Sequence, residues 1–191
     1  GLKLNGGGRH ETTEISSAGG GPLDASTGAT KFGSASGRQF SPKSYSVAGV
    51  YSFNRNWNLS LAHSSSSRAP TQGELFANGP HIATAAYEVG NRNFNLEKSS
   101  AQDLTLKFRT GAHSASVGVF RQKFRDFTTL FASGRTRGAD GEINPVDADG
   151  NGNADGSGER ILNELVYRAV RAEFRGFEAQ GKMRSEEHTS E

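Results

Sequence analysis

The sequence predicts an all-β fold: a section of antiparallel sheet that crosses a membrane as part of a transmembrane β-barrel. Three observations predict it. Apolar and small polar residues alternate along several segments, which gives each segment one apolar and one polar face. The connections between these segments alternate between short turns and long polar loops. Only 33% of the 191 residues are hydrophobic and 25 are glycine, a composition that is thin for a packed core but sufficient for strands whose apolar face meets lipid.

The alternation is clearest where apolar residues or glycine occupy the odd positions of Tyr45–Phe53, and apolar residues those of Trp57–Leu61. We expect strands there, over 43–53 and 57–65. A soluble sheet would show the same period of two, so the alternation alone does not identify the solvent.

Four further segments complete six expected strands. The first is weakened by three consecutive glycines at 6–8, because glycine in a strand adds no side chain to pack. The four expected strands cover 2–15, 101–110, 114–132 and 162–183.

The strand over 114–132 changes phase along its length. Val117 and Val119 share one face, whereas Phe120 and Phe124 fall on the other. Either a β-bulge shifts the alternation there or the two rings line the inner rim of the barrel.

The connections sort by length. Residues 54–56 and 111–113 form short turns, whereas 16–39, 66–100 and 133–160 are long. Outer-membrane barrels have short periplasmic turns at one rim and long extracellular loops at the other, whereas a soluble β-sandwich has no reason to segregate its loops. The connection 66–100 is rich enough in apolar residues to be partly folded.

Several classes of protein are disfavoured. The chain has no cysteine, which excludes disulfides and thiolate metal sites, and its net charge is +2 with no basic stripe, so nucleic acid is not an expected partner. No run of 18 apolar residues predicts a membrane-spanning helix. The sequence contains no Gly-x-Ser-x-Gly nucleophile elbow, no phosphate-binding glycine motif and no His-Glu-x-x-His zinc-binding motif. We therefore expect that the protein is not an enzyme.

The two ends suggest a part of a longer protein. The chain begins at Gly1 without an initiator methionine. Residues 184–191 resemble the translation of a common sequencing adapter and interrupt the alternation. We therefore expect a partial barrel domain over 1–183 and a non-native tail over 184–191.

Several stretches, in order, resemble the barrel of TonB-dependent outer-membrane receptors. They lie at 44–53, 68–70, 74–76, 79–84, 87–91, 96–99 and 173–179. The resemblance implies a 22-stranded barrel around a plug domain, in the outer membrane of a Gram-negative cell. It implies import of iron-siderophore or metal complexes, with outer-membrane lipid as surroundings and the TonB energy-coupling protein as a partner that acts through the plug. The plug, the coupling box and the last barrel strand are not in this sequence.

The connection 66–100 carries the candidate ligand-binding residues, Arg68, Glu74, His81 and Glu88. Arg68 offers forked donors to an anionic siderophore, or it braces the barrel lip by pairing with a carboxylate. His81 is either a turn residue or a metal ligand, with Glu74 and Glu88 as oxygen partners. Its Gly-Pro-His segment is similar to that of family members implicated in zinc uptake.

A second candidate site is a calcium loop. Asp147, Asp149 and Asn151 take positions 1, 3 and 5 of the calcium pattern, with glycine at position 6 and Asp155 at position 9. Position 12 falls on a glycine and the next residue is Glu159, so the bidentate ligand is missing. The alternative is a flexible acidic loop; no other cofactor is expected.

Four functions remain open at this point. The first is a receptor for iron-siderophore or metal complexes energised by TonB, and the second is a zinc-uptake receptor of the same architecture. The third is a passive porin, which needs no plug. The fourth is a soluble, secreted calcium-binding β-domain, which the acidic loop alone motivates.

Overall fold

The computed structural model describes residues 1–183, and the predicted non-native tail at 184–191 lies outside them. The chain forms strands joined by short and long connections, with one short helix. The elements are β1 (Leu2–His10), β2 (Thr13–Ser17), β3 (Ser36–Phe40), β4 (Lys43–Ser52), β5 (Trp57–Arg68), α1 (Gln72–Phe76), β6 (Asn78–His81), β7 (Ala86–Val89), β8 (Glu97–Thr110), β9 (His113–Arg137) and β10 (Leu162–Lys182). No helix within 1–183 has the length and apolar character needed to cross a membrane.

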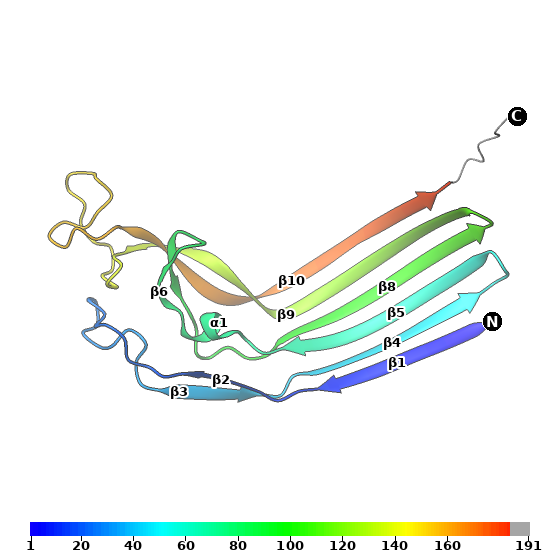
Figure 1. The fold of residues 1–191 in the computed structure, drawn as a ribbon, viewed down its shortest axis with the longest axis horizontal. Coiled ribbons are helices and arrows are strands. Elements are labelled where there is room, and N and C mark those ends of the chain that lie inside the picture. Colours follow the sequence, from blue (N-terminus) through cyan, green and yellow to red (C-terminus); the bar gives the residue numbers. More distant parts are fainter. Residues whose placement is uncertain (184–191) are drawn as a thin grey trace, which may run out of the picture.

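Eight strands form one open sheet in the order β1-β4-β5-β8-β9-β10-β7-β6, and β2 pairs with β3 in a separate hairpin. All neighbours are antiparallel except β7 and β10. In Figure 1 the long strands lie side by side, with the short turns and Gly1 at one end and the long connections at the other. The predicted all-β barrel section, with loops segregated by length, is confirmed.

One face of the sheet carries the apolar residues. Leu59 is paired with Leu106, and Leu106 is paired with Val117, so strands distant in sequence align their apolar positions. The apolar side chains of this face are exposed. Leu61, for example, is 60% exposed and Phe177 is 77% exposed. An uncovered apolar face along paired strands is what lipid-facing strands require.

The strands extend further than predicted at the end that carries the long connections. β5 continues to Arg68, β8 begins at Glu97, and β9 reaches Arg137. The strand expected over 2–15 is broken into β1 and β2, and its three glycines lie within continuous β1. The glycines are paired with β4, so a strand interrupted at 6–8 is not what forms; the strand ends after His10 instead.

The phase change in β9 has a definite structure. Phe120 lies opposite Gly176, and Phe124 lies opposite Ala172. The bulge comes after both, where the register shifts between Val170 and Ala172. Phe120 and Phe124 therefore lie on the face opposite Val117 and Val119, and the Phe124 ring packs 5.7 Å from that of Phe174. Of the two alternatives, the aromatic lining of the inner rim explains both rings.

The hydrophobic core lies in the long connections, beyond the apolar face of the sheet. Phe40 of β3, Leu75 and Phe76 of α1, and Phe94 are buried together, with Tyr167 of β10 packed against them. We call this region the outer cap. It comprises residues 11–42, 66–100 and 126–170. The predicted loop 66–100 is thus folded, with α1, β6 and β7 inside it (Figure 1).

Candidate functional site

Arg68 stands at the base of the outer cap and is held by two carboxylates. Its guanidinium donates to Glu74 at 3.0 and 3.1 Å, to Glu97 at 2.8 and 3.4 Å, and to the Ala69 carbonyl at 3.4 Å. These five hydrogen bonds match the five N–H donors of arginine. The geometry is that of a brace between β5, α1 and β8, with no donor left over for a ligand.

Glu74 and Glu97 are positioned by backbone groups as well. Thr71 and Glu74 form a capping box at the start of α1, in which the Thr71 N–H donates to Glu74 at 2.7 Å. The Thr128 N–H donates to Glu97 at 3.0 Å. Burial works to raise the pKa of Glu97, but the hydrogen bonds from Arg68 and Thr128 outweigh it and hold that pKa below its usual range.

Three side chains contact the Glu88 carboxylate within the outer cap. Its carboxylate is buried, accepting hydrogen bonds from Thr84 at 2.8 Å and Tyr167 at 2.9 Å. His81 Nδ1 lies 3.3 Å from the same carboxylate, and the His81 side chain is 55% exposed. Burial, followed by the bond to Glu88, raises the pKa of Tyr167 to about 12. Among the described residues no hydrogen bond engages His81 Nε2, so this nitrogen of the half-exposed imidazole is available to a ligand.

Tyr87 joins all three long connections. Its side chain is 0% exposed, and its ring lies between Lys31, at 5.4 Å, and Arg137, at 5.3 Å. Its hydroxyl donates to Asn78 at 2.9 Å, and the Asn78 amide donates to the Lys31 carbonyl at 2.8 Å. Burial raises the pKa of Tyr87 to about 12. Cation–π contacts in a desolvated site are worth about 2 kcal/mol each, so this ring is a strong link.

A buried ion pair lies beside Tyr87. Glu164 is 0% exposed and accepts from Arg137 at 2.5 Å and from Arg135 at 2.7 Å. Arg137 also donates to the Gly141 carbonyl at 2.7 Å and lies 3.9 Å from Asp24. Arg137 therefore contacts its own β9–β10 connection through Gly141, the connection 16–39 through Asp24, and the connection 66–100 through the Tyr87 ring.

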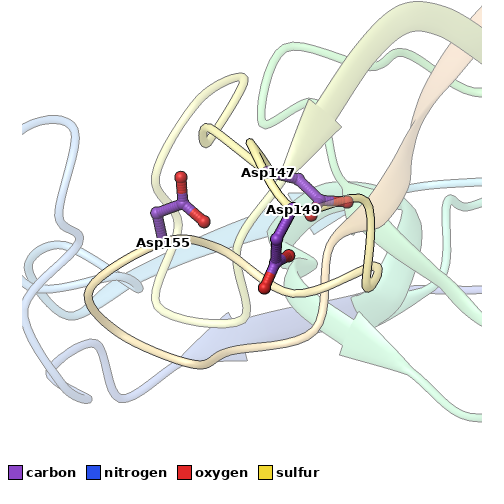
Figure 2. Close-up of side chains that lie close together, drawn as sticks. All are labelled: Asp147, Asp149 and Asp155. Atoms are coloured by element: carbon purple, nitrogen blue, oxygen red, sulfur yellow. The ribbon is translucent and has the colours of Figure 1, made fainter.

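The acidic loop brings three of its four predicted ligands together. The carboxylates of Asp147, Asp149 and Asp155 offer oxygens within 4.8 Å of one another. Figure 2 shows these three side chains on the loop. Asn151 lies beside them: its backbone N–H donates to Asp147 at 3.0 Å, its side-chain amide donates to Asp149 at 2.8 Å, and its side-chain oxygen accepts from the Asn153 N–H at 2.8 Å. Glu159 accepts from the Asp140 N–H at 2.7 Å and lies outside the group.

The candidate residues therefore separate into three places. Arg68 and Glu74 form an ion pair in one place, and His81 lies beside Glu88 in another. The structure does not bring Glu74 to His81, and among the described residues the aspartates of the acidic loop are the only group of three or more that could hold a metal ion. Neither Tyr87 nor the Arg137–Glu164 pair was predicted from the sequence. Arg137 and Glu164 are 27 residues apart, on either side of a long loop, and no sequence pattern connects them.

Comparison with known proteins identifies the barrel. Residues 1–186 match the family described as TonB dependent receptor-like, beta-barrel. The fold resembles a double mutant of the Serratia marcescens hemophore receptor HasR, solved with its hemophore HasA and heme, at a TM-score of 0.58 and 16% identity over 94% of this chain. It also resembles the siderophore receptor PirA from Acinetobacter baumannii, at a TM-score of 0.52 and 14% identity over 94% of this chain.

The chain spans 29% of the HasR chain and 31% of the PirA chain. At these identities the structural likeness establishes the fold, and the family match covers nearly the whole sequence. The resemblance inferred from the sequence is confirmed. The chain belongs to the TonB-dependent receptor β-barrel family, whose members are outer-membrane transport proteins of Gram-negative bacteria and not enzymes.

Proposed function

We propose that this chain is a section of a receptor that imports an iron-bearing complex, a ferric siderophore or heme, with energy supplied through the TonB system. The family match over residues 1–186 carries the proposal. It favours active uptake over the passive porin and over the soluble calcium-binding domain. The two structures of similar fold are titled as receptors for heme-loaded hemophore and for siderophore, which supports iron complexes as the cargo class.

The chemistry of the cap favours an iron complex over a free zinc ion. A zinc site needs three or four protein ligands, whereas His81 has one carboxylate beside it and that carboxylate is already engaged by Thr84 and Tyr167. A single imidazole with a free Nε2 suits a metal that arrives with most of its ligands already supplied. We therefore assign His81 as the cargo contact and Glu88 as the group that orients it.

A growth assay with the complete receptor tests this function. The receptor is expressed in a strain without other iron-uptake receptors, on medium where heme or one ferric siderophore is the sole iron source. We expect growth on one of these sources and its loss when TonB is deleted. Equal growth without TonB would contradict active transport.

His81→Ala separates iron from zinc. Loss of one metal or charge-assisted contact, on the order of 1.5 kcal/mol, raises the iron-complex concentration for half-maximal growth about tenfold. Zinc-limited growth stays unchanged. The matched control is His63→Ala, since His63 is paired with Val47 and Gln102 on the lipid-facing strands. A defect confined to zinc-limited growth would support the zinc importer instead.

We also propose that the acidic loop binds Ca²⁺. The spacing of Asp147, Asp149 and Asp155 fits the calcium pattern, and oxygens within 4.8 Å of one another suit Ca–O distances of about 2.4 Å. Without a bidentate glutamate the expected dissociation constant is about 10⁻⁴–10⁻³ M. Calorimetry on the complete receptor should show one site that Asp149→Asn removes and Glu142→Gln retains. Calcium heats that are unaffected by Asp149→Asn would exclude this site.

A further inference from the structure

The lipid-facing side of β9 and β10 changes abruptly from apolar to cationic. Val119 is paired with Phe177, whereas two residues further along Arg121 is paired with Arg175. Beyond them the same face carries Lys123, Arg125 and Arg171, because side chains alternate along each strand and the bulge leaves Arg171 facing the same side. On β8 the matching position is Lys98, which is paired with Arg125.

These cations surround an open hollow of about 630 Å³. Its lining includes Lys98, Lys123, Arg125 and Arg171, together with the hydroxyls of Ser65 and Ser100. One carboxylate also lines it, that of Glu173, and it is held by Arg121 at 2.9 Å. Within residues 1–183 the four lining cations form no ion pair. The hollow therefore carries four cations against the one carboxylate of Glu173, and its net charge is positive.

The height of the hollow follows from the strand. Ten residues of β8 separate Lys98 from Phe108, the lowest apolar residue of that strand's lipid-facing side. At a rise of about 3.3 Å per residue and a tilt of about 40°, this is about 25 Å. The apolar band of an outer-membrane barrel is about 25 Å high, so Lys98 and Arg125 lie at its outer edge. Lys123 and Arg121 lie one and two rows nearer the membrane interior, where their long side chains can extend the charge toward the headgroups.

An apolar depression lies next to the hollow on the side of the membrane interior. It measures about 410 Å³, and its lining includes Leu61, Leu104 and Val119. The register places Leu61, Leu104 and Val119 in one row across β5, β8 and β9, two rows from Ser65, Ser100 and Lys123. A ligand that fills both places has an apolar tail and an anionic head.

We propose that this surface binds one phosphorylated lipid of the outer leaflet, with its phosphate in the cationic hollow and an acyl chain against the apolar row. Forked guanidinium groups and serine hydroxyls are suited to phosphate oxygens. The adjoining apolar row selects a lipid headgroup over free phosphate. The site faces the membrane and is independent of the cargo that the receptor carries.

The test uses the complete receptor in a zwitterionic detergent and fluorescent, bisphosphorylated lipid A as the probe. The variant Lys123→Gln/Arg125→Gln/Arg171→Gln should bind it on the order of 100-fold more weakly, since each cation near an anionic lipid surface contributes about fivefold. The matched control is Lys107→Gln/Arg109→Gln, which removes two cations from the opposite face of β8 and should bind as the wild type does.

Two further arms use the wild-type protein and do not depend on the variant folding. Dephosphorylated lipid A with the same acyl chains should bind at least tenfold more weakly than the phosphorylated probe. Inorganic phosphate at the probe's concentration should not displace it. Equal binding of both lipids, unchanged binding by the triple variant, or full displacement by inorganic phosphate would each overturn the proposal.

Discussion

Glu164 accepts a hydrogen bond from Arg137 across 2.5 Å, and both side chains are buried in the outer cap. The pair lies against Tyr87, which the Arg137 guanidinium covers. A buried charge that loses its partner is left uncompensated, so such a pair is more costly to break than a surface ion pair. This contact is therefore where the cap should be most sensitive to substitution.

Glu164→Gln should loosen the cap without unfolding the barrel. It leaves buried Arg137 with only the more distant carboxylate of Asp24, at 3.9 Å, at a cost of about 3 kcal/mol. Amide hydrogen exchange of the complete receptor should accelerate on the order of 100-fold within 69–96 and 138–161. Glu173→Gln, in an exposed pair with Arg121, is the control and should leave exchange in these segments unchanged. Equal exchange in both variants would contradict the assigned role of Glu164.

Tyr87 should show a graded response. Tyr87→Phe keeps the ring between Lys31 and Arg137 but removes the hydrogen bond to Asn78, at a cost of about 1 kcal/mol. Tyr87→Ala removes the ring as well and should cost about 3–5 kcal/mol. Protease cleavage within all three long connections should rise together in the alanine variant. Cleavage confined to 69–96 would show that Tyr87 does not join them.

The cap should weaken in acid. Burial works to raise the pKa values of Asp24 and Glu164, but hydrogen bonds, chiefly from Ser26 and Thr27 to Asp24 and from Arg137 to Glu164, hold both below their ordinary values of 3.8 and 4.5. A carboxyl with a lowered folded pKa stabilises the fold above its unfolded pKa, and this contribution is lost as the pH falls through the folded value. A spin label at exposed Gln72 should therefore gain mobility below about pH 4 and stay constant from pH 6 to 8. Constant mobility down to pH 3 would contradict this.

Much of the transmembrane part was predictable, because hydrocarbon imposes a strict alternation. Leu104, Leu106 and Phe108 fall on one face in the sequence and in the structure. The strand ends were not predictable in this way. Near the membrane surface both faces of the sheet are polar, so Ser99 and Ser100 carry no alternation, although they lie within β8.

The cap shows both kinds of outcome. The spacing of Thr71 and Glu74 is a capping-box signal that was available in the sequence although no helix was predicted from it, and α1 begins directly after Thr71. The partners of Arg68 and Tyr87 carry no such signal. They are brought together only by the packing of connections that are separated by tens of residues, so the sequence alone named Arg68 and Glu74 without showing that they form one brace.

The most direct test concerns which face of the sheet meets lipid. These 191 residues contain no cysteine, so in a complete receptor whose remaining residues are also free of cysteine, single cysteines at 103 to 108 can each carry a nitroxide label in a bilayer. At positions 104, 106 and 108 we expect accessibility to oxygen dissolved in the lipid, and at 103, 105 and 107 accessibility to a water-soluble nickel complex. Labels at 104, 106 and 108 that are shielded from both reagents would place these side chains in a protein interior and contradict the account.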